Sequence, residues 1–302
     1  MPLGASPVPD ALWQELAPAK LNLALHVGAP RADGYHPLWS IVAFADVGDR
    51  LRYTPSDHLH LSVEGPFAGA LADEDPNTNL VLRAAQALAA ELGHKATGQL
   101  HLHKALPVAA GLGGGSADAA AALRLLNRAW GAQLSLTALA EIAKPLGADV
   151  PVCVQGQGAL MTGIGHDLRP MDLLSFPAVL VNPLRPCSTG AVYRVFDEKA
   201  QFAKDLDRKI EGDCDGEVLT HTRNDLLAAA CAVCPEINDV LTVVTAHPGT
   251  RLARLSGSGA TVWVMMESRE QAEDLVNAIH THHLHWWAVA TQVGARPADT
   301  GI

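Results

Sequence analysis

A glycine-rich segment from Pro107 to Asp118 has the composition of a loop that binds an anion. It reads PVAAGLGGGSAD, and glycine fills every position from 111 to 115 except Leu112. Glycine leaves no side chain to keep backbone N–H groups away from a ligand. An Ala-rich segment at residues 116–130 predicts a helix, whose N-terminus offers unpaired N–H groups and the positive end of its dipole. The segment therefore predicts a cradle for a polyphosphate.

Two familiar phosphate-binding motifs do not fit this loop. A P-loop requires a lysine directly after its last glycine, and here Ser116 follows. The dinucleotide fingerprint requires a third glycine at that same position. A tight turn whose glycines serve packing alone is the alternative, but three consecutive glycines cost backbone entropy unless something approaches them closely. The loop alone thus indicates an anion site and leaves its class open.

Two other segments carry side chains suited to phosphoryl transfer, and a third could assist them. The predicted strand Ala19–Val27 alternates aliphatic and polar residues, which places Lys20 and Asn22 on the same face. Asp149 lies in LGADVP, between a glycine turn and a proline that stiffens the backbone. Such a carboxylate more often caps a helix than acts as a base. The segment 254–260 reads RLSGSGA, which could close over a phosphate or form an ordinary turn.

Two adjacent rings, Tyr35 and His36, follow Asp33 and Gly34. The Asp-Gly pair predicts a turn, because glycine adopts positive φ without steric cost. Two flat rings could stack on a nucleobase and read its edge. The alternative interpretation of this segment is an ordinary hairpin turn.

Composition narrows the class of protein. The chain has 302 residues, 48% hydrophobic and 18% charged, which is enough for one large core or two ordinary domains. A formal net charge of -10 argues against a broad nucleic-acid-binding face. The first residues show no secretory signal, and no apolar stretch approaches the roughly 18 residues that cross a bilayer. We therefore expect a cytoplasmic protein with neither a membrane nor a nucleic-acid partner.

The cysteines and histidines do not predict a metal site. Five scattered cysteines do not fit a disulfide framework. Cys231 and Cys234 form a single C-x-x-C motif, which we interpret as helix packing because no second pair completes a zinc site. The histidine-rich tract at residues 280–285 has no carboxylate or cysteine partner at helical spacing.

Strands and helices are mixed along the chain without an internal repeat, which predicts an α+β fold. Besides 19–27, strands are expected at 41–44, 51–53, 59–63, 99–103, 178–181, 261–266 and 288–291. Helices are expected at 79–92, 116–130, 136–144 and 268–280, and from residue 225. We expect a boundary between two halves near residues 165–174.

Together and in this order, these segments resemble the GHMP kinases, a family named for its galactose, homoserine, mevalonate and phosphomevalonate substrates. Residues 107–117 are similar to the family's ATP-binding loop, and the SGSG segment is similar to its C-terminal loop. The resemblance covers nearly the whole chain and implies a two-domain α+β kinase. It implies an N-terminal domain at 1–168, like the second domain of ribosomal protein S5, and a ferredoxin-like C-terminal domain at 169–302. ATP and Mg²⁺ would lie between them.

The segments PAKLNL, RADGYH, LGADVP and NDL are most similar to one branch of the family. Members of this branch phosphorylate the 2-hydroxyl of a cytidylyl substrate in the non-mevalonate route to isoprenoids. The resemblance implies that Asp149 takes the hydroxyl proton, while Lys20 keeps it ionised and stabilises charge on the transferred phosphoryl group. It implies ATP contacts from Asn79, Lys104, Pro107, Val108, Ala109, Ala110, Gly111, Leu112, Gly113, Gly114, Gly115, Ser116 and Ala117. It implies substrate contacts from Asn22, Tyr35, His36, Thr189 and Tyr193.

Two other functions stay open at this point: a GHMP kinase of mevalonate or homoserine type, and a nucleotide-binding sensor without catalysis. The DGYH segment argues against the first, because other members bind no cytosine. The presence of both Lys20 and Asp149 argues against the second. We expect a monomer or a weak homodimer. No acidic cluster for Mg²⁺ is visible, so its ligands stay unassigned.

Overall fold

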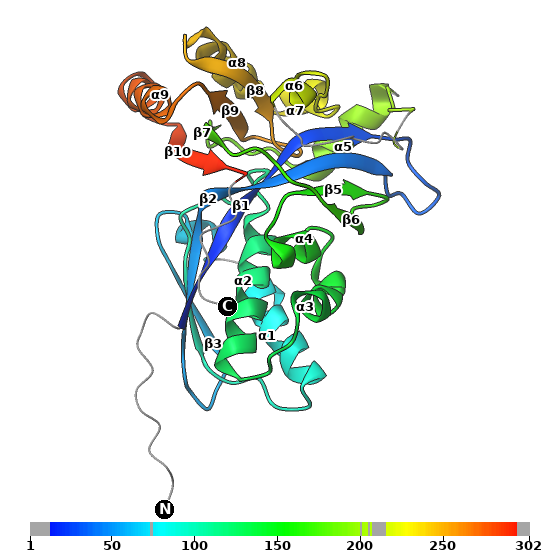
Figure 1. Cartoon of the computed structure of the whole chain (residues 1–302), viewed down its shortest axis with the longest axis vertical. Coiled ribbons are helices and arrows are strands. Elements are labelled where there is room, and N and C mark those ends of the chain that lie inside the picture. The colour runs from blue at the N-terminus through cyan, green and yellow to red at the C-terminus, as the bar shows by residue number, and fades with distance from the viewer. Residues whose placement is uncertain (1–12, 73–74, 200, 205, 207–215, 295–302) are drawn as a thin grey trace, which may run out of the picture.

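The computed structural model describes residues 13–72, 75–199, 201–204, 206 and 216–294. These form a mixed sheet with helices packed against it (Figure 1). The strands are β1 (Gln14–Val27), β2 (Leu38–Thr54), β3 (His60–Glu64), β4 (Gln99–His103), β5 (Ala159–Thr162), β6 (Asp167–Pro170), β7 (Phe176–Asn182), β8 (Thr250–Leu255), β9 (Val262–Met266) and β10 (Trp287–Val293). The helices are α1 (Leu80–Glu91), α2 (Gly114–Ala129), α3 (Leu136–Ala143), α4 (Val150–Gln155), α5 (Thr189–Lys199), α6 (Gly216–Thr220), α7 (Leu227–Val233), α8 (Glu236–Ala246) and α9 (Arg269–His282).

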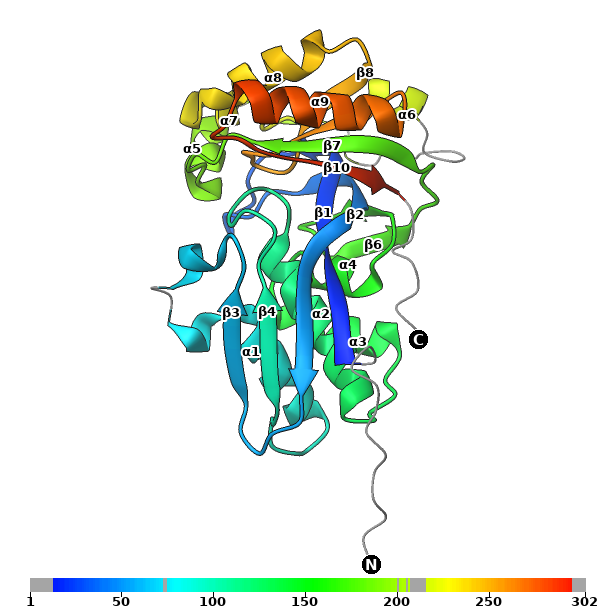
Figure 2. The same cartoon turned by 90° about the vertical axis from the view of Figure 1, so that its left-hand side faces the viewer.

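The N-terminal half is a sheet with helices on one face. β1 and β4 pair antiparallel with β2, and β3 lies parallel to β4 at the edge. α1 and α2 cover one face of these strands, and the described part of the chain places no helix on the other (Figure 2). The apolar side chains of these helices form one core with the strands, including Leu51, Leu88, Leu100 and Leu123. This arrangement fixes the start of α2 beside the end of β4.

A bulge in β1 ends the alternation that the sequence predicts. The pairing of β1 with β2 shifts register between Asn22 and Ala24, so Leu23 is an extra residue. Leu21, Leu23 and Ala24 consequently lie in the same core cluster. The prediction of a single aliphatic face along the whole strand is therefore wrong beyond Asn22, although Lys20 and Asn22 do lie side by side.

The C-terminal half has the strand order β10-β7-β9-β8, with every neighbouring pair antiparallel. Helices connect β7 to β8 and β9 to β10, which gives the β–α–β–β–α–β order of a ferredoxin-like layer, as the family resemblance implies. α8 and α9 cover the outer face of this layer (Figure 1). Cys234 is buried in its core and Cys231 packs against that core, in agreement with the interpretation of this pair.

β1 and β2 join the two halves, because both strands continue beneath the C-terminal layer (Figure 2). A third core cluster lies at this junction and includes Leu21, Trp39, Ile41 and Trp263. The strand that carries Lys20 is therefore packed against both halves. The division into domains 1–168 and 169–302 stays a prediction, and its boundary falls within β6.

Several element boundaries differ from the sequence-based expectation. The segments 41–44 and 51–53 belong to one long strand, β2, and the helix expected from residue 225 begins at Leu227. The short elements β5, β6 and α4, as well as α5, α8 and β8, were not expected. Among the described residues, no helix is both long and apolar enough to cross a membrane.

Candidate active site

Lys20 and Asp149 form an ion pair between β1 and the start of α4. Lys20 Nζ lies 2.8 Å from Asp149 Oδ2, and the lysine side chain is only 5% exposed. The Asp149 side chain is 33% exposed, so a hydroxyl from solvent or from a ligand can reach it. The structure thus brings together the two residues for which the resemblance implies a catalytic role.

The local fold leaves the Asp149 carboxylate free to make this pair. Asp149 occupies the N-cap position of α4, but its side chain makes no capping hydrogen bond. Val150 N instead donates to Gly147 O at 3.1 Å, which closes the turn before the helix. The interpretation of Asp149 as an ordinary helix cap is therefore wrong for the side chain.

Asn22 supports the lysine from the same strand. Its Oδ1 accepts a hydrogen bond from Lys20 Nζ at 3.1 Å, and its Nδ2 donates to Ser40 Oγ at 2.7 Å. The residue is 3% exposed. These contacts orient the ammonium group, and a contact between Asn22 and substrate stays a prediction.

The glycine loop runs directly past the Lys20 side chain. Gly113 has φ +61°, and a Cβ built there would lie 3.1 Å from Lys20 Cε. Lys20 N also donates to Leu112 O at 2.9 Å, which fixes the loop against β1. Glycine is therefore required at position 113 both for the backbone conformation and for the approach of the lysine.

A second loop, residues 256–260, also packs against the glycine loop. Ser256 Oγ donates to Gly111 O at 2.8 Å, and Thr261 N donates to Ala110 O at 3.1 Å. Thr189 Oγ1 lies 2.8 Å from Ser258 Oγ, which places the start of α5 beside this loop. The segment RLSGSGA therefore packs against the glycine loop rather than forming an isolated turn.

α2 begins inside the glycine run, at Gly114 rather than at Ser116 as expected. The N–H groups of its first turn have no carbonyl partner within the helix and point toward the loop. Ala117 N donates to Gly113 O at 2.8 Å, so the helix forms without a break after the left-handed Gly113. Several N–H donors and the positive end of the helix dipole are therefore directed toward the glycine loop, where an anion could bind.

A pocket of about 180 Å³ lies beside this helix N-terminus. It is lined by Leu71, Thr78, Asn79, Leu80, Lys104, Pro107, Val108, Ala109, Gly114, Gly115 and Asp118. Asn79 also caps α1, because its Oδ1 accepts from Val81 N at 2.9 Å. The structure thus brings Asn79 and Lys104 to the glycine loop, as the resemblance implies for the ATP site.

Lys104 lies between two buried carboxylates that sequence reasoning missed. Its Nζ donates to Asp49 Oδ2 at 2.5 Å and to Asp118 Oδ2 at 2.8 Å. Burial acts to lower the pKa of Lys104, but the two carboxylates outweigh it and raise the pKa. Asp118 stands four residues after Gly114, one helical turn on, and this spacing is the signal that could have identified it.

His36 lies in an aromatic cluster next to α5. Its Nδ1 donates to Gly28 O at 2.8 Å, and its Nε2 lies 3.3 Å from Asp197 Oδ1. The ring centroid of Tyr193 is 5.1 Å from that of His36. Burial raises the pKa of the Tyr193 hydroxyl to about 12, and the nearby Asp149 and Asp197 add to this effect. Tyr193, and with it the adjacent His36 ring, therefore lies near Asp149.

The adjacent pair of rings expected from the sequence is separated in the structure. Tyr35 is 62% exposed, whereas the side chain of His36 is 7% exposed. Tyr35 N donates to Asp33 Oδ1 at 3.1 Å, which holds the turn before it. A contact between Tyr35 and a base stays a prediction, and the ring that pairs with His36 is Tyr193.

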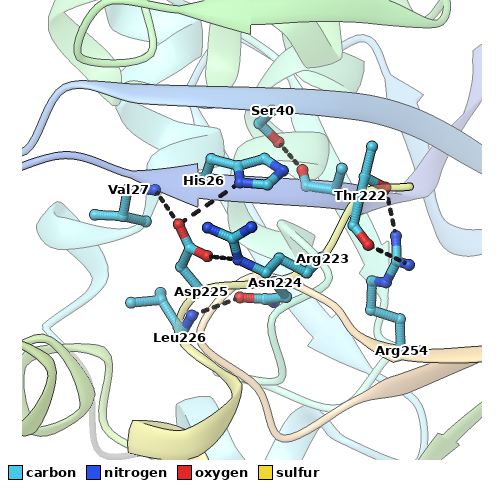
Figure 3. A network of polar contacts seen from close by, with 10 residues as sticks. His26, Val27, Ser40, Thr222, Arg223, Asn224, Asp225, Leu226 and Arg254 are labelled. Atoms are coloured by element: carbon cyan, nitrogen blue, oxygen red, sulfur yellow. Dashed lines mark hydrogen bonds and ion pairs between the residues drawn. The ribbon is translucent and has the colours of Figure 1, made fainter. Parts of the chain in front are cut away.

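The segment from Thr222 to Leu226 lies against the end of β1 (Figure 3) and also contacts the second loop. Asn224 Nδ2 donates to Gly257 O at 2.8 Å. Asp225 Oδ2 accepts from Val27 N at 3.0 Å. The NDL segment therefore contacts both elements that pack against the glycine loop, namely β1 and residues 256–260.

Arg254 makes the second connection in this network (Figure 3). Its Nη1 donates to Leu23 O at 2.7 Å and to Thr222 Oγ1 at 2.8 Å. Burial lowers the pKa of Arg254 to about 10, which still leaves the guanidinium charged at neutral pH. Arg254 thus holds the bulge of β1 close to Lys20.

Comparison with known proteins identifies the class. The family model for the N-terminal domain of GHMP kinases matches residues 79–157. A homoserine kinase from Cytophaga hutchinsonii shares the fold, with a TM-score of 0.66 at 16% identity over 97% of each chain. A crystal structure of a 4-(cytidine 5'-diphospho)-2C-methyl-D-erythritol kinase has a TM-score of 0.77 at 33% identity and covers 93% of this chain and 99% of that one. The fold is that of a GHMP kinase.

The 4-diphosphocytidyl-2-C-methyl-D-erythritol kinase of Methylorubrum extorquens is 45% identical over 285 residues, which is 92% of this chain and 97% of the relative. The chain belongs to the family of 4-diphosphocytidyl-2-C-methyl-D-erythritol kinases. It is therefore an enzyme, a kinase that uses ATP, as the resemblance implies.

Proposed function

We propose that the chain transfers the γ-phosphoryl group of ATP to the 2-hydroxyl of 4-diphosphocytidyl-2-C-methyl-D-erythritol, a step of the non-mevalonate route to isoprenoids. One observation carries this proposal: the Lys20 side chain is ion-paired with Asp149 and also passes directly over Gly113 of the glycine loop. The Lys20 side chain therefore contacts both the proposed base, Asp149, and the loop proposed to bind the phosphates.

Asp149 is the general base in this proposal. Its carboxylate removes the proton of the 2-hydroxyl while the hydroxyl oxygen attacks the γ-phosphorus, and ADP leaves on the opposite side. Lys20 stabilises the negative charge on the phosphoryl oxygens and holds the carboxylate in place. Because Lys20 is buried and hydrogen-bonded to Asn22, little reorganisation is needed when this charge develops.

ATP occupies the pocket beside α2 in this proposal. Its phosphates accept hydrogen bonds from the N–H groups between Gly111 and Ala117, and Asn79 and Lys104 border its adenosine end. Mg²⁺ would be held through the phosphates of ATP, where it would neutralise part of their charge. The described residues contain no group of three or more His, Cys, Asp or Glu side chains able to hold a metal ion, so phosphate oxygens and water would supply most of its ligands.

The cytidine end of the substrate binds beside α5. His36 and Tyr193 offer a buried aromatic surface for the base, and Thr189 offers a hydroxyl between this surface and the second loop. Tyr35 and Asn22 complete the proposed substrate contacts from β1 and the turn that follows it. We infer a cytoplasmic enzyme, monomeric or weakly dimeric, that acts on a small soluble substrate without a nucleic-acid or membrane partner.

A coupled assay of ADP release tests the function. We expect turnover with 4-diphosphocytidyl-2-C-methyl-D-erythritol and none above background with mevalonate or homoserine. Phosphorylation of either of the last two at a comparable rate would contradict the proposal, and nucleotide binding without turnover of any acceptor would favour the sensor.

The variant Asp149→Asn tests the assigned base. We expect kcat to fall by about a thousandfold or more, because the amide cannot accept the proton, while ATP affinity stays within about threefold. Single-turnover measurements and ATP titrations follow the two quantities separately. Unchanged turnover would remove Asp149 from the mechanism.

A further inference from the structure

Arg124 on α2 holds β1 through two bonds. Its Nε donates to Glu15 Oε1 at 2.8 Å and its Nη2 donates to Leu16 O at 3.2 Å. The Arg124 side chain is 12% exposed and that of Glu15 is 4% exposed. A buried, charge-assisted pair of this kind is stronger than a surface ion pair, because little solvent screens it. β1 is therefore attached firmly to α2 four residues before Lys20.

The same guanidinium also holds the far end of α4. Its Nη1 donates to Cys153 O at 2.7 Å and to Val154 O at 3.3 Å. These carbonyls belong to the last turn of the helix, where carbonyl groups lack partners within the helix and where a positive charge is favourable. α4 has only six residues. Fixing its last turn therefore also fixes its first residue, and Asp149 directly precedes that residue.

Cys153, a buried residue of α4, lies near the charges of the site. Burial raises the pKa of Cys153 to about 12; Asp149 adds to this effect, and Lys20 and Arg124 oppose it. The catalytic ion pair and the Arg124 guanidinium thus all act on the same sulfur atom.

We propose that Arg124 is a positioning residue that sets the separation of Lys20 and Asp149 by tying β1 and α4 to one guanidinium. The inference rests on the proposed function, since it assigns a role within the same phosphoryl transfer. Neither catalytic side chain touches Arg124 directly. The arginine acts through the backbone carbonyls of Leu16, Cys153 and Val154.

Arg128 provides a matched control one turn along α2. Its Nη2 contacts Glu15 Oε2 at 2.6 Å and donates to Gln14 O at 3.3 Å. It therefore holds the same carboxylate and the same strand as Arg124, but its hydrogen bonds do not reach α4. A comparison of the two arginines separates the connection between β1 and α4 from general support of β1.

The experiment is carried out in a Glu15→Gln background. Removing one arginine from the native chain would leave the Glu15 carboxylate buried with fewer partners, which is strongly destabilising by itself. In the background variant no buried carboxylate is left unpaired when an arginine is removed, and the amide oxygen of the substituted side chain can still accept a hydrogen bond from the remaining arginine. The melting temperature of each variant shows that it is folded before its kinetics are compared. Arg124→Met and Arg128→Met are then added separately, and kcat and both KM values are measured well below the melting temperature of each variant.

We expect Arg124→Met in this background to lower kcat at least about tenfold with KM for ATP within about twofold, because a small misplacement of reacting groups affects the transition state more than nucleotide binding. Arg128→Met should leave kcat within about twofold of the background. Equal losses in both variants, an unchanged kcat in the Arg124 variant, or a kcat loss matched by a rise in KM for ATP would overturn the proposal. An inactive wild-type enzyme in the same assay would instead refute the proposed function.

Discussion

Two lysines of the site are buried, and their surroundings suit them to different tasks. Lys104 lies between Asp49 and Asp118, and the fully buried Asp49 alone suffices to neutralise its charge. Lys20 has one carboxylate partner, Asp149, and one neutral partner, Asn22. A transferred phosphoryl group can therefore use the charge of Lys20 more effectively than that of Lys104. This difference at the residue level agrees with a structural role for Lys104 beside the nucleotide.

The substitution His36→Ala tests the cytosine site. We expect it to raise KM for the cytidylyl substrate by about tenfold or more and KM for ATP by less than about twofold, because the ring contributes a buried aromatic contact. Tyr35→Ala should raise KM for the cytidylyl substrate less, since its ring is 62% exposed. Steady-state kinetics with each substrate varied in turn provide the measurement. Equal increases in both KM values for His36→Ala would contradict the assignment.

The ion pair of Lys20 and Asp149 could be predicted from the sequence only through the family resemblance. The spacing places Lys20 beside Asn22, but nothing in the sequence alone indicates that Asp149 lies next to them. Asp49 was missed because it lies in an otherwise ordinary strand, and the spacing of Asp118 from Gly114 indicates a place near the loop but not the contact with Lys104. Convergence of this kind depends on long-range packing, which local patterns do not contain.

At the level of elements, the glycine loop is shaped by its neighbours as much as by its own sequence. Gly111 has φ +77°, and a Cβ there would lie 2.3 Å from Ser256 O. The loop and the segment 256–260 therefore touch backbone to backbone. Side chains at this contact would force the two loops apart and displace the donors at the start of α2.

The substitution Gly111→Ala tests this contact. We expect it to lower the free energy of unfolding and to weaken ATP binding by at least about tenfold, because a backbone carbonyl cannot move aside as a flexible side chain could. Gly131→Ala is the control. That glycine has φ +67° with nothing within 4 Å of a Cβ, so it should cost about 1 to 2 kcal/mol of conformational strain and leave ATP affinity unchanged. Urea unfolding and ATP titration measure both effects, and equal changes in ATP affinity would argue against the contact.

The periodic segments that form α1, α2 and β4 were predicted from the sequence, whereas β5, β6 and α4 and the longer helices α5 and α8 were not. Residues 99–103 form β4 as expected, and α3 and α9 begin at or within one residue of their expected starts, each capped by a serine. α2 begins two residues earlier than expected, because its first turn contains Gly114 and Gly115, and glycine has a low helix propensity. The bulge at Leu23 left no sequence signal, since a buried Leu suits either face of a strand buried on both sides.

On the scale of the whole molecule, the buried Asp118 predicts how stability depends on pH. Burial raises the pKa of Asp118 to about 8, with Lys104 opposing this effect and Asp49 adding to it. The folded state therefore holds a proton that the unfolded chain releases near pH 4. The stability that this proton contributes is complete below about pH 4 and is lost as the pH rises through about 8.

We expect the free energy of unfolding to fall between about pH 5 and 8, by up to about 1.4 kcal/mol per pH unit from this group, and to fall less steeply in Asp118→Asn. Urea unfolding at a series of pH values provides the comparison. Parallel curves for the two proteins would show that Asp118 is ionised throughout this range.

β1 and β2 run through both halves, so the sequences of the two halves cannot change independently. Leu21, Trp39 and Ile41 on these strands face Trp263 of the C-terminal layer in one shared core. If the N-terminal half of another family member were fused to residues 169–302 of this chain, the side chains on its first two strands would not be matched in shape to the C-terminal layer of this chain. The halves of this enzyme are therefore not exchangeable modules: a functional chimera would have to carry this strip of side chains together with the layer that it packs against.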